Sequence, residues 1–208
     1  MDVMTAATDL DKVAADLFIW QAYDPAVKAD LFSSAIVTAD GIFVVDPIPL
    51  RKAPLAQLHD QGVIAGVIVT NANHLRASSQ FAERFSVPIL ARRAVFPDRT
   101  PPQFSELADG EKICDELNVI GIEGAVAGEV VLHCASGGGT LIAGDALINF
   151  QPYGFTFLPG KYCSDEKEMR RSLRKLLSYK TDRMLFAHGL PILSKASDRL
   201  HQLLDGDL

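Results

Sequence analysis

The chain has 208 residues, of which 48% are hydrophobic and 22% are charged, and this composition is typical of a soluble globular protein rather than a disordered or fibrous one. Its net charge of −6 excludes long-range attraction to nucleic acid or to an anionic membrane. The length suits one α/β domain with a sizeable core, so we expect a single domain over residues 1–208.

The cysteines and the apolar runs bear on where the protein resides. The three cysteines are widely spaced and form no CxxC pair, which favours a reducing compartment over a disulfide framework. Neither a stretch of 18 apolar residues nor a basic leader followed by an apolar segment occurs. We therefore expect a cytoplasmic protein that contacts neither membrane nor nucleic acid.

The first half of the chain predicts strands that alternate with helices. A strand is expected at residues 17–23, and Asp40-Gly41 predicts a hairpin turn between residues 32–38 and 42–46. The β-branched, apolar run 63–69 predicts a strand buried on both faces. The other elements expected here are helices at 50–61 and 77–85, a strand at 87–91, and a proline-rich loop at 92–106 that would cover the site.

The second half predicts short antiparallel strands followed by helices. Ser164 precedes an acidic cluster and is the expected N-cap of a helix over residues 164–179. Strands are expected at residues 112–114, 117–122, 129–134, 140–143 and 184–187, and a closing helix at 193–204. Two similar halves of mixed sheet, each with helices on its outer face, predict an α/β (α+β) fold built as a four-layer α/β/β/α sandwich.

Polar residues follow the ends of the predicted strands. Asn71, Asn73, His74 and Arg76 come directly after the buried strand, at the edge of the sheet where α/β folds place their ligands. His188 follows the last strand and precedes a glycine, where the backbone can approach a ligand closely. These positions are therefore the first candidates for a functional site.

The order and spacing of these elements resemble the metallo-β-lactamase superfamily of hydrolases over nearly the whole chain. The resemblance is carried by the hairpin ending at Asp46, the strand ending at Thr70, the Gly144-Asp145 step and the strand ending at His188. It implies a four-layer sandwich with a His-x-His-x-Asp-His motif after Thr70, which in that family supplies most ligands of a two-zinc site. It also implies that Asp145 and His188 stand at the positions of the bridging aspartate and the final histidine.

The zinc motif is degenerate in this chain. The family's ligand positions after Thr70 hold Asn71, Asn73, Leu75 and Arg76, and Glu129 stands where a further histidine is expected. Amide oxygens are weak ligands for zinc, and a guanidinium repels a dication. Tight dinuclear zinc is therefore not expected. A divalent cation, zinc or manganese, would be bound weakly, with Asp145 and His188 as its ligands.

The residue types suggest roles for seven side chains. The catalytic candidates are Asp145 and Glu129 as general bases and His188 as an acid or base. The substrate-binding candidates, suited to an anionic group, are Arg76, Asn71, Asn73 and His74. Arg76 is interpreted either as the counter-ion of Asp145 in place of a metal or as a solvent-facing residue at the start of a helix. For His74 a structural hydrogen bond is favoured over a ligand role.

Two classes of function remain open. The resemblance implies a hydrolase of a small ester, thioester or lactone, working without a metal or with a weakly held one. The alternative is a non-catalytic member of the fold that binds a small anion or a protein partner. We expect a small-molecule, anionic ligand and a monomer or homodimer, with the aromatic segment 150–162 lining an apolar pocket or a dimer contact.

Overall fold

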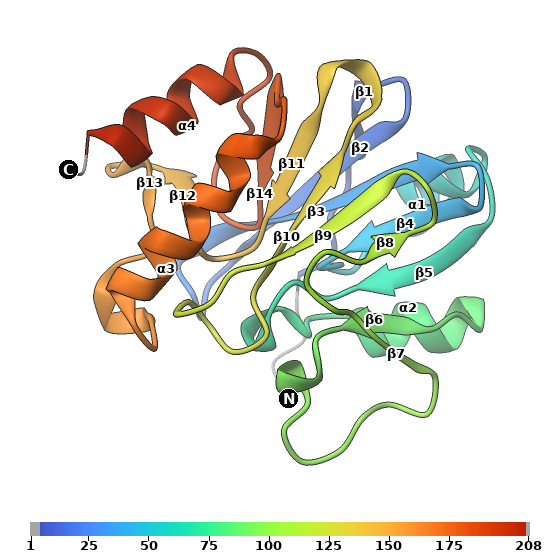
Figure 1. The fold of residues 1–208 in the computed structure, drawn as a ribbon. Coiled ribbons are helices and arrows are strands. Elements are labelled where there is room, and N and C mark those ends of the chain that lie inside the picture. The colour runs from blue at the N-terminus through green and yellow to red at the C-terminus, as the bar shows by residue number, and fades with distance from the viewer. Residues whose placement is uncertain (1–4, 207–208) are drawn as a thin grey trace.

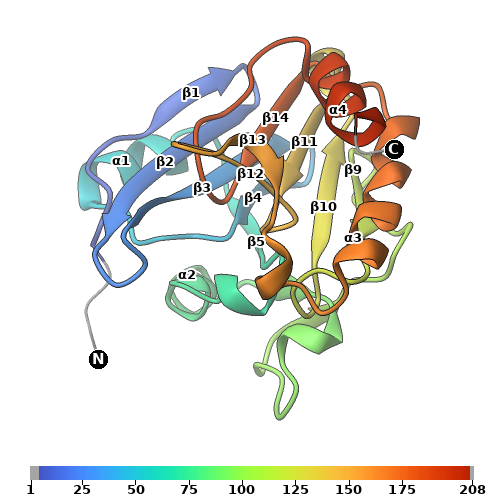
Figure 2. The same ribbon diagram turned by 90° about the vertical axis from the view of Figure 1, so that its left-hand side faces the viewer.

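The computed structural model describes residues 5–206 and stacks two β-sheets face to face, with helices on both outer sides (Figure 1). The helices are α1 (Lys52–His59), α2 (Ser78–Phe85), α3 (Glu166–Leu173) and α4 (Ala196–Asp205). Figure 2 shows α1 and α2 on one side of the molecule and α3 and α4 on the other. The predicted α/β/β/α sandwich is thus confirmed. Within residues 5–206 no helix has the length and apolar character needed to cross a bilayer.

The first sheet has the strand order β1-β2-β3-β4-β5-β6-β7. Its strands are β1 (Asp11–Ala14), β2 (Leu17–Asp24), β3 (Ala29–Thr38), β4 (Gly41–Val45), β5 (Ile64–Ile68), β6 (Ile89–Ala91) and β7 (Phe104–Glu106). β1 to β4 pair antiparallel, whereas β4, β5 and β6 run parallel because α1 and α2 carry the chain back across the sheet. β1 was not predicted, and β7 lies in the segment predicted as loop, where the preceding prolines obscure it.

The second sheet has the strand order β14-β11-β10-β9-β8. Its strands are β8 (Lys112–Ile113), β9 (Leu117–Gly121), β10 (Val130–Cys134), β11 (Thr140–Ala143) and β14 (Arg183–Phe186). β8 to β11 form the predicted antiparallel meander, and β14 pairs parallel to β11. The prediction of Ser164 as the N-cap of α3 is wrong by one residue. The Asp165 carboxylate accepts the hydrogen bond from the Glu168 N–H, because Asp165 is the last residue with extended backbone before the helix.

An additional hairpin joins β12 (Leu147–Phe150) to β13 (Gly154–Phe157). It overlaps the aromatic segment 150–162, and no secondary structure was predicted for either strand. Phe150 and Tyr153 pack edge to face at 5.6 Å between ring centroids, next to the turn. The hairpin therefore holds aromatic side chains in fixed positions beside the second sheet.

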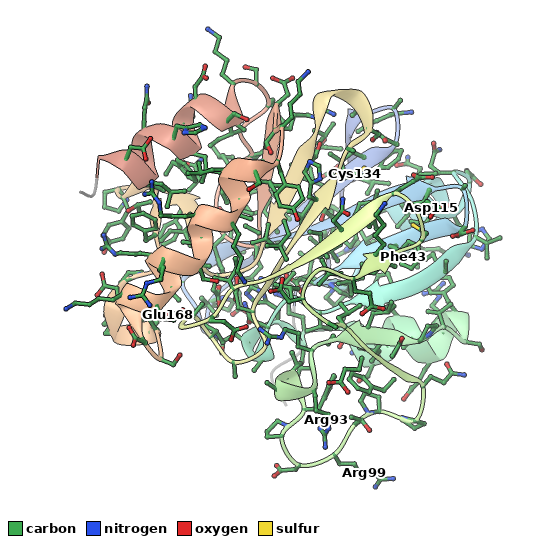
Figure 3. All side chains as sticks on the ribbon, in the orientation of Figure 1. Phe43, Arg93, Arg99, Asp115, Cys134 and Glu168 are labelled. Atoms are coloured by element: carbon green, nitrogen blue, oxygen red, sulfur yellow. The ribbon has the colours of Figure 1, made fainter. Side chains whose placement is uncertain are left out.

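Alternation of side chains along the strands divides the core into layers. In β4, Val44 packs toward α1 and α2, whereas Phe43 and Val45 pack between the sheets. Leu132 and Ile142 of the second sheet belong to the same middle layer. Figure 3 labels Phe43 and Cys134, which are both buried in this layer. Other elements cover both faces of the central strands. Polar side chains of this region can therefore reach solvent only at the ends of these strands.

The two sheets meet along one edge of the sandwich. The Phe32 N–H in β3 donates to the carbonyl oxygen of Ala187, directly after β14, at 3.0 Å. Leu31 and His188 form an isolated antiparallel bridge at the same place. This junction brings residues that follow strands of both sheets into one region.

Candidate active site at the strand ends

Four strands deliver polar residues to this region. Asp46 follows β4, Thr70 follows β5, Asp145 follows β11 and His188 follows β14. β4 and β5 are parallel neighbours, as are β11 and β14, so each pair of strands ends at the same edge of its sheet. The site is therefore assembled from both halves of the chain.

Three side chains converge at one point. His74 Nε2 lies 3.1 Å from Asp145 Oδ1 and 3.3 Å from His188 Nε2. His188 Nε2 lies 3.3 Å from the same Asp145 oxygen. His74 and Asp145 are buried, and His188 is partly exposed. We call these three residues the His74–Asp145–His188 triangle.

His74 is held by its other ring nitrogen. It ends the short 3₁₀ turn η1 (Ala72–His74), and its Nδ1 lies 2.9 Å from Asp46 Oδ2 and 2.9 Å from Thr70 Oγ1. Asp46 is fixed in turn by the Thr70 backbone N–H at 2.8 Å and by the Thr70 hydroxyl at 2.5 Å. These contacts aim Nε2 of His74 at Asp145 and His188.

The charges of Asp46, His74 and Asp145 stabilise one another. Burial alone would lower the pKa of His74, but the carboxylates of Asp46 and Asp145 raise it to about 9. Burial would raise the pKa of Asp46, but the charge of His74 and its hydrogen bond, with Arg76 and Thr70, bring it below its usual range. Asp46 was seen in the sequence only as the end of a hairpin, although its position directly after β4 was a usable signal.

Asp145 and His188 are the candidates that the sequence placed in the centre of the site. Burial opposes ionisation of Asp145, but His74 and His188 hold the pKa of its carboxyl well below the usual range. Its second oxygen, Oδ2, accepts a hydrogen bond from Asn73 Nδ2 at 2.9 Å. Burial lowers the pKa of His188, only partly offset by its hydrogen bond to Asp145. At neutral pH the site thus holds an ionised carboxylate beside a neutral imidazole.

Arg76 points inward, but its contacts differ from the predicted ones. Its guanidinium donates to the carbonyl oxygens of Phe32 at 2.5 Å, Asp46 at 3.1 Å and Ala187 at 3.3 Å. The described contacts of Asp145 are instead with Asn73 and the two histidines. Of the two interpretations of Arg76, neither holds as stated: the side chain is turned inward rather than to solvent, and the nearest counter-ion of Asp145 is His74. A positive φ of 37° at Arg76 turns the backbone here, and the sequence gives no sign of that turn.

Asn71 and Glu129 lie behind the triangle and bond to each other. Asn71 Nδ2 donates to Glu129 Oε2 at 2.7 Å, and the Ala146 N–H donates to Oε1 at 3.0 Å. Asn71 Oδ1 accepts from the Asn73 N–H at 2.9 Å. Both side chains are fully buried, and burial together with Asp145 raises the pKa of Glu129 to about 8. These hydrogen bonds hold Asn71 and Glu129 to each other and to the backbone beside the triangle.

A cleft of about 690 Å³ opens over the triangle. Its walls are largely apolar or aromatic, and they include Leu31, Ile148, Phe150, Tyr153 and Tyr162. The exposed residues Lys28, Lys161 and Asn73 and the partly buried Arg76 also line it. The aromatic segment 150–162 thus contributes to the pocket, as one of its two predicted roles required.

The prediction that residues 92–106 cover the site is wrong. Among the described residues that line the cleft, none comes from this segment. Figure 3 shows Arg93 and Arg99 on a loop that projects away from the two sheets. The reason is that β6 and β7 lie at the edge of the first sheet, separated by β4 and β5 from β3 at the junction, so the loop between them extends away from the cleft.

The donor set fits one metal ion better than two. The triangle offers two imidazole nitrogens and a carboxylate oxygen, all within 4.8 Å of one another, which is a donor set that zinc and iron accept. At the other family position, Asn71 and Glu129 hydrogen-bond to each other, and amides are poor zinc ligands. The residues present therefore fit a single cation.

The comparisons with known proteins agree with this architecture. A family model described as the metallo-beta-lactamase superfamily matches residues 10–206. No curated protein matches the chain significantly.

Solved structures of similar shape include two metallo-beta-lactamases and one protein in a di-iron-bound form. The DIM-1 metallo-beta-lactamase has a TM-score of 0.76 and 13% identity, with 99% of this chain and 100% of that chain covered. A metallo-beta-lactamase from Pontibacter korlensis has a TM-score of 0.70 and 16% identity, covering 95% and 98%. TTHA1623 in a di-iron-bound form has a TM-score of 0.62 and 20% identity, covering 83% and 94%. At these identities the likeness concerns the fold.

Proposed function

Because the chain belongs to the metallo-β-lactamase superfamily, we propose that it is a hydrolase of a small acyl compound, an ester, thioester or lactone. The reaction would add water across the acyl bond and release a carboxylic acid and an alcohol or thiol. The observation that carries the proposal is the cleft itself, whose floor is the His74–Asp145–His188 triangle. Pockets that combine apolar walls with a few convergent polar groups are the usual sites of such chemistry.

The residues of the chain have distinct parts in this proposal. The ionised Asp145 offers Oδ1 toward the cleft, while Asn73 keeps its Oδ2 in place. The neutral His188 presents Nε2 at the same point, where it accepts a proton or binds a cation. A divalent cation held by His74, Asp145 and His188 would polarise the acyl carbonyl and lower the pKa of water nearby.

The lining of the cleft suggests the kind of substrate. Apolar and aromatic side chains make up most of the wall, which suits a hydrophobic acyl or alcohol group. Lys28 and Lys161 at the exposed margin would attract a carboxylate or phosphate on the same molecule. We therefore propose a small amphipathic anion as the substrate.

The test is a panel of ester, thioester and lactone substrates, assayed with chelator and with added Zn²⁺ or Mn²⁺. Asp145→Asn and His188→Ala should each lower kcat/KM by roughly 100-fold or more, the scale of a lost acid–base group. His201→Ala, on the exposed face of α4, is the matched control and should keep the wild-type rate. Equal rates for Asp145→Asn and wild type would contradict the proposal.

A non-catalytic role in binding a small anion is the second candidate. It is favoured by the extent to which site residues already satisfy one another, since Arg76 is bonded to three carbonyl oxygens and Asn71 to Glu129. Saturable binding of an anionic substrate analogue, with no turnover of any panel member under either metal condition, would support this candidate instead.

A further inference from the structure

We infer that the protein binds one divalent transition-metal ion through His74 Nε2, Asp145 Oδ1 and His188 Nε2. His74 stands at a position that the family's zinc motif leaves free, so the ligand set is this chain's own. The inference does not depend on hydrolysis, because a metal can be bound by a protein that catalyses nothing.

The spacing of the three atoms carries the inference. Their separations are 3.1, 3.3 and 3.3 Å, which makes a nearly equilateral triangle. Bonds of about 2.0–2.1 Å to a tetrahedral zinc ion place neighbouring ligand atoms roughly 3.3–3.4 Å apart. The three side chains therefore already stand at the spacing of three corners of a zinc site.

The surroundings of His74 match those of a metal-binding histidine. A ligating imidazole usually gives its second nitrogen to a carboxylate, which fixes the ring and its tautomer. Asp46 Oδ2 lies 2.9 Å from His74 Nδ1, and Thr70 holds that carboxylate from two sides. Asp46 is therefore a positioning residue for the ion. His74 is protonated on both nitrogens in the ion-free site and would release its Nε2 proton on binding the ion, while the hydrogen kept on Nδ1 leaves the Nε2 lone pair directed at the triangle.

The same contacts limit the site to one ion. The second family position is occupied by the Asn71–Glu129 hydrogen bond, and Glu129 also accepts from the Ala146 N–H. Leu75 offers no ligand atom and is exposed. The Arg76 guanidinium lies close enough to lower the pKa of His74 by its charge. A second dication would have to break these bonds and approach that positive charge.

The ion would keep an open coordination position. All three triangle residues line the cleft, and the side chain of His188 is 16% exposed. Three protein ligands with one open position are typical of catalytic rather than structural zinc. The proposed ion thus faces the same cleft as the substrate of the proposed hydrolase.

The experiment titrates chelator-treated, full-length protein with Zn²⁺ and with Co²⁺ alone. We expect one equivalent of metal by elemental analysis after gel filtration, visible cobalt absorption of a four-coordinate site, and a higher Tm with zinc. Asp46→Asn should weaken binding by roughly 10–100-fold, the range for groups that orient a ligand. His74→Ala and His188→Ala remove a ligand and should exceed the upper end of that range.

His59→Ala and His201→Ala are the controls, because both histidines lie on exposed helix surfaces. Both variants should keep the wild-type affinity. Circular dichroism verifies folding, and His74→Gln replaces His74→Ala if that variant does not fold.

Three results would overturn the inference. These are no bound metal in folded wild type, two tightly bound equivalents, or unchanged affinity in a folded His74 variant. If folded wild type binds no metal, the triangle is instead held together by hydrogen bonds of a protonated His74, which bridges the carboxylates of Asp46 and Asp145. One bound equivalent without turnover of the substrate panel would reject the hydrolase but keep the ion.

Discussion

At the scale of single residues, the buried pair of Asp46 and His74 decides how the site is built. Both side chains are almost fully buried, so bulk solvent is largely excluded from the contact between the two charges. Asp46 also adopts a positive φ of 47°, which aspartate and asparagine tolerate better than most residues. The pair therefore combines a backbone turn, a charge and the orientation of an imidazole in one contact.

Replacing Asp46 with Asn should destabilise the protein by about 3–5 kcal/mol, because the remaining charge of His74 loses its buried partner. Asn keeps the size of the side chain and its tolerance of the positive φ, so the change isolates the charge. Urea denaturation measures the difference. Asp205→Asn, in the exposed pair with Arg174, is the control and should cost within the roughly 0–1 kcal/mol range of surface pairs. Equal effects of the two variants would show that the buried charge is not what matters.

His133 provides a pH dependence that is independent of the site. Its ring packs on Tyr179 with centroids 4.7 Å apart, and its Nε2 lies 3.1 Å from the Lys180 carbonyl oxygen. Burial lowers the pKa of His133, against the opposing effect of that hydrogen bond. The folded-state pKa thus lies below the unfolded value of about 6.5.

Because of this shift, the unfolded state takes up the proton first as the pH falls. The stability that comes from a neutral His133 is complete above about pH 6.5 and decreases as the pH falls toward the folded-state pKa. Wild type should therefore lose stability relative to His133→Gln between about pH 7 and pH 5. Urea denaturation of both proteins across this range checks the sign. A constant difference across the range would contradict it.

At the scale of elements, Glu129 joins parts of the fold that are distant in sequence. It precedes β10, and its carboxyl accepts hydrogen bonds from Ala146 after β11 and from Asn71 after β5. It thereby links the end of a strand in the first sheet to two strands of the second. This structural role accounts for its complete burial.

Glu129→Ala should lower the free energy of unfolding by about 2–6 kcal/mol, because two buried donors each lose an acceptor worth roughly 1–3 kcal/mol. Chemical denaturation measures the loss. Glu123→Ala is the control, since that side chain is about half exposed in its ion pair with Arg92 and should cost little. A loss below 1 kcal/mol for Glu129→Ala would mean that water replaces the carboxyl.

The sequence patterns predicted the elements whose core positions are regular. The β-branched run that became β5 and the Asp-Gly turn between β3 and β4 are determined by local chemistry, so they could be read directly. β7 and the β12–β13 hairpin were missed, because prolines and isolated aromatic residues there mask short strands that depend on their neighbours for pairing.

The candidate site was predicted in composition but not in contacts. Asp145, His188, Asn73 and Arg76 all line the cleft. The position of His74 in the triangle depends on a 3₁₀ turn and on positive φ values at Asp46 and Arg76. The residue types alone predict neither this turn nor these φ values. His74 also falls between the positions of the family's zinc ligands, so the resemblance gives it no role as a ligand.

At the scale of the whole molecule, the site lies where the sheets of two chain halves meet. Arg76, just after η1 in the first half, donates to Phe32 in β3 and to Ala187 after β14. The same guanidinium thus connects strand β3 of one sheet to the end of strand β14 in the other. His74 and Asp46 come from the first half of the chain, and Asp145 and His188 from the second.

Because the site residues come from both halves of the chain, the site can form only late in folding. Neither half of the chain contains all the residues of the proposed site, so binding of the proposed ion or substrate would require the two sheets to have docked. Binding of the proposed ligand would then require completed assembly, and a change that loosens the contact between the halves should abolish this binding before the protein unfolds.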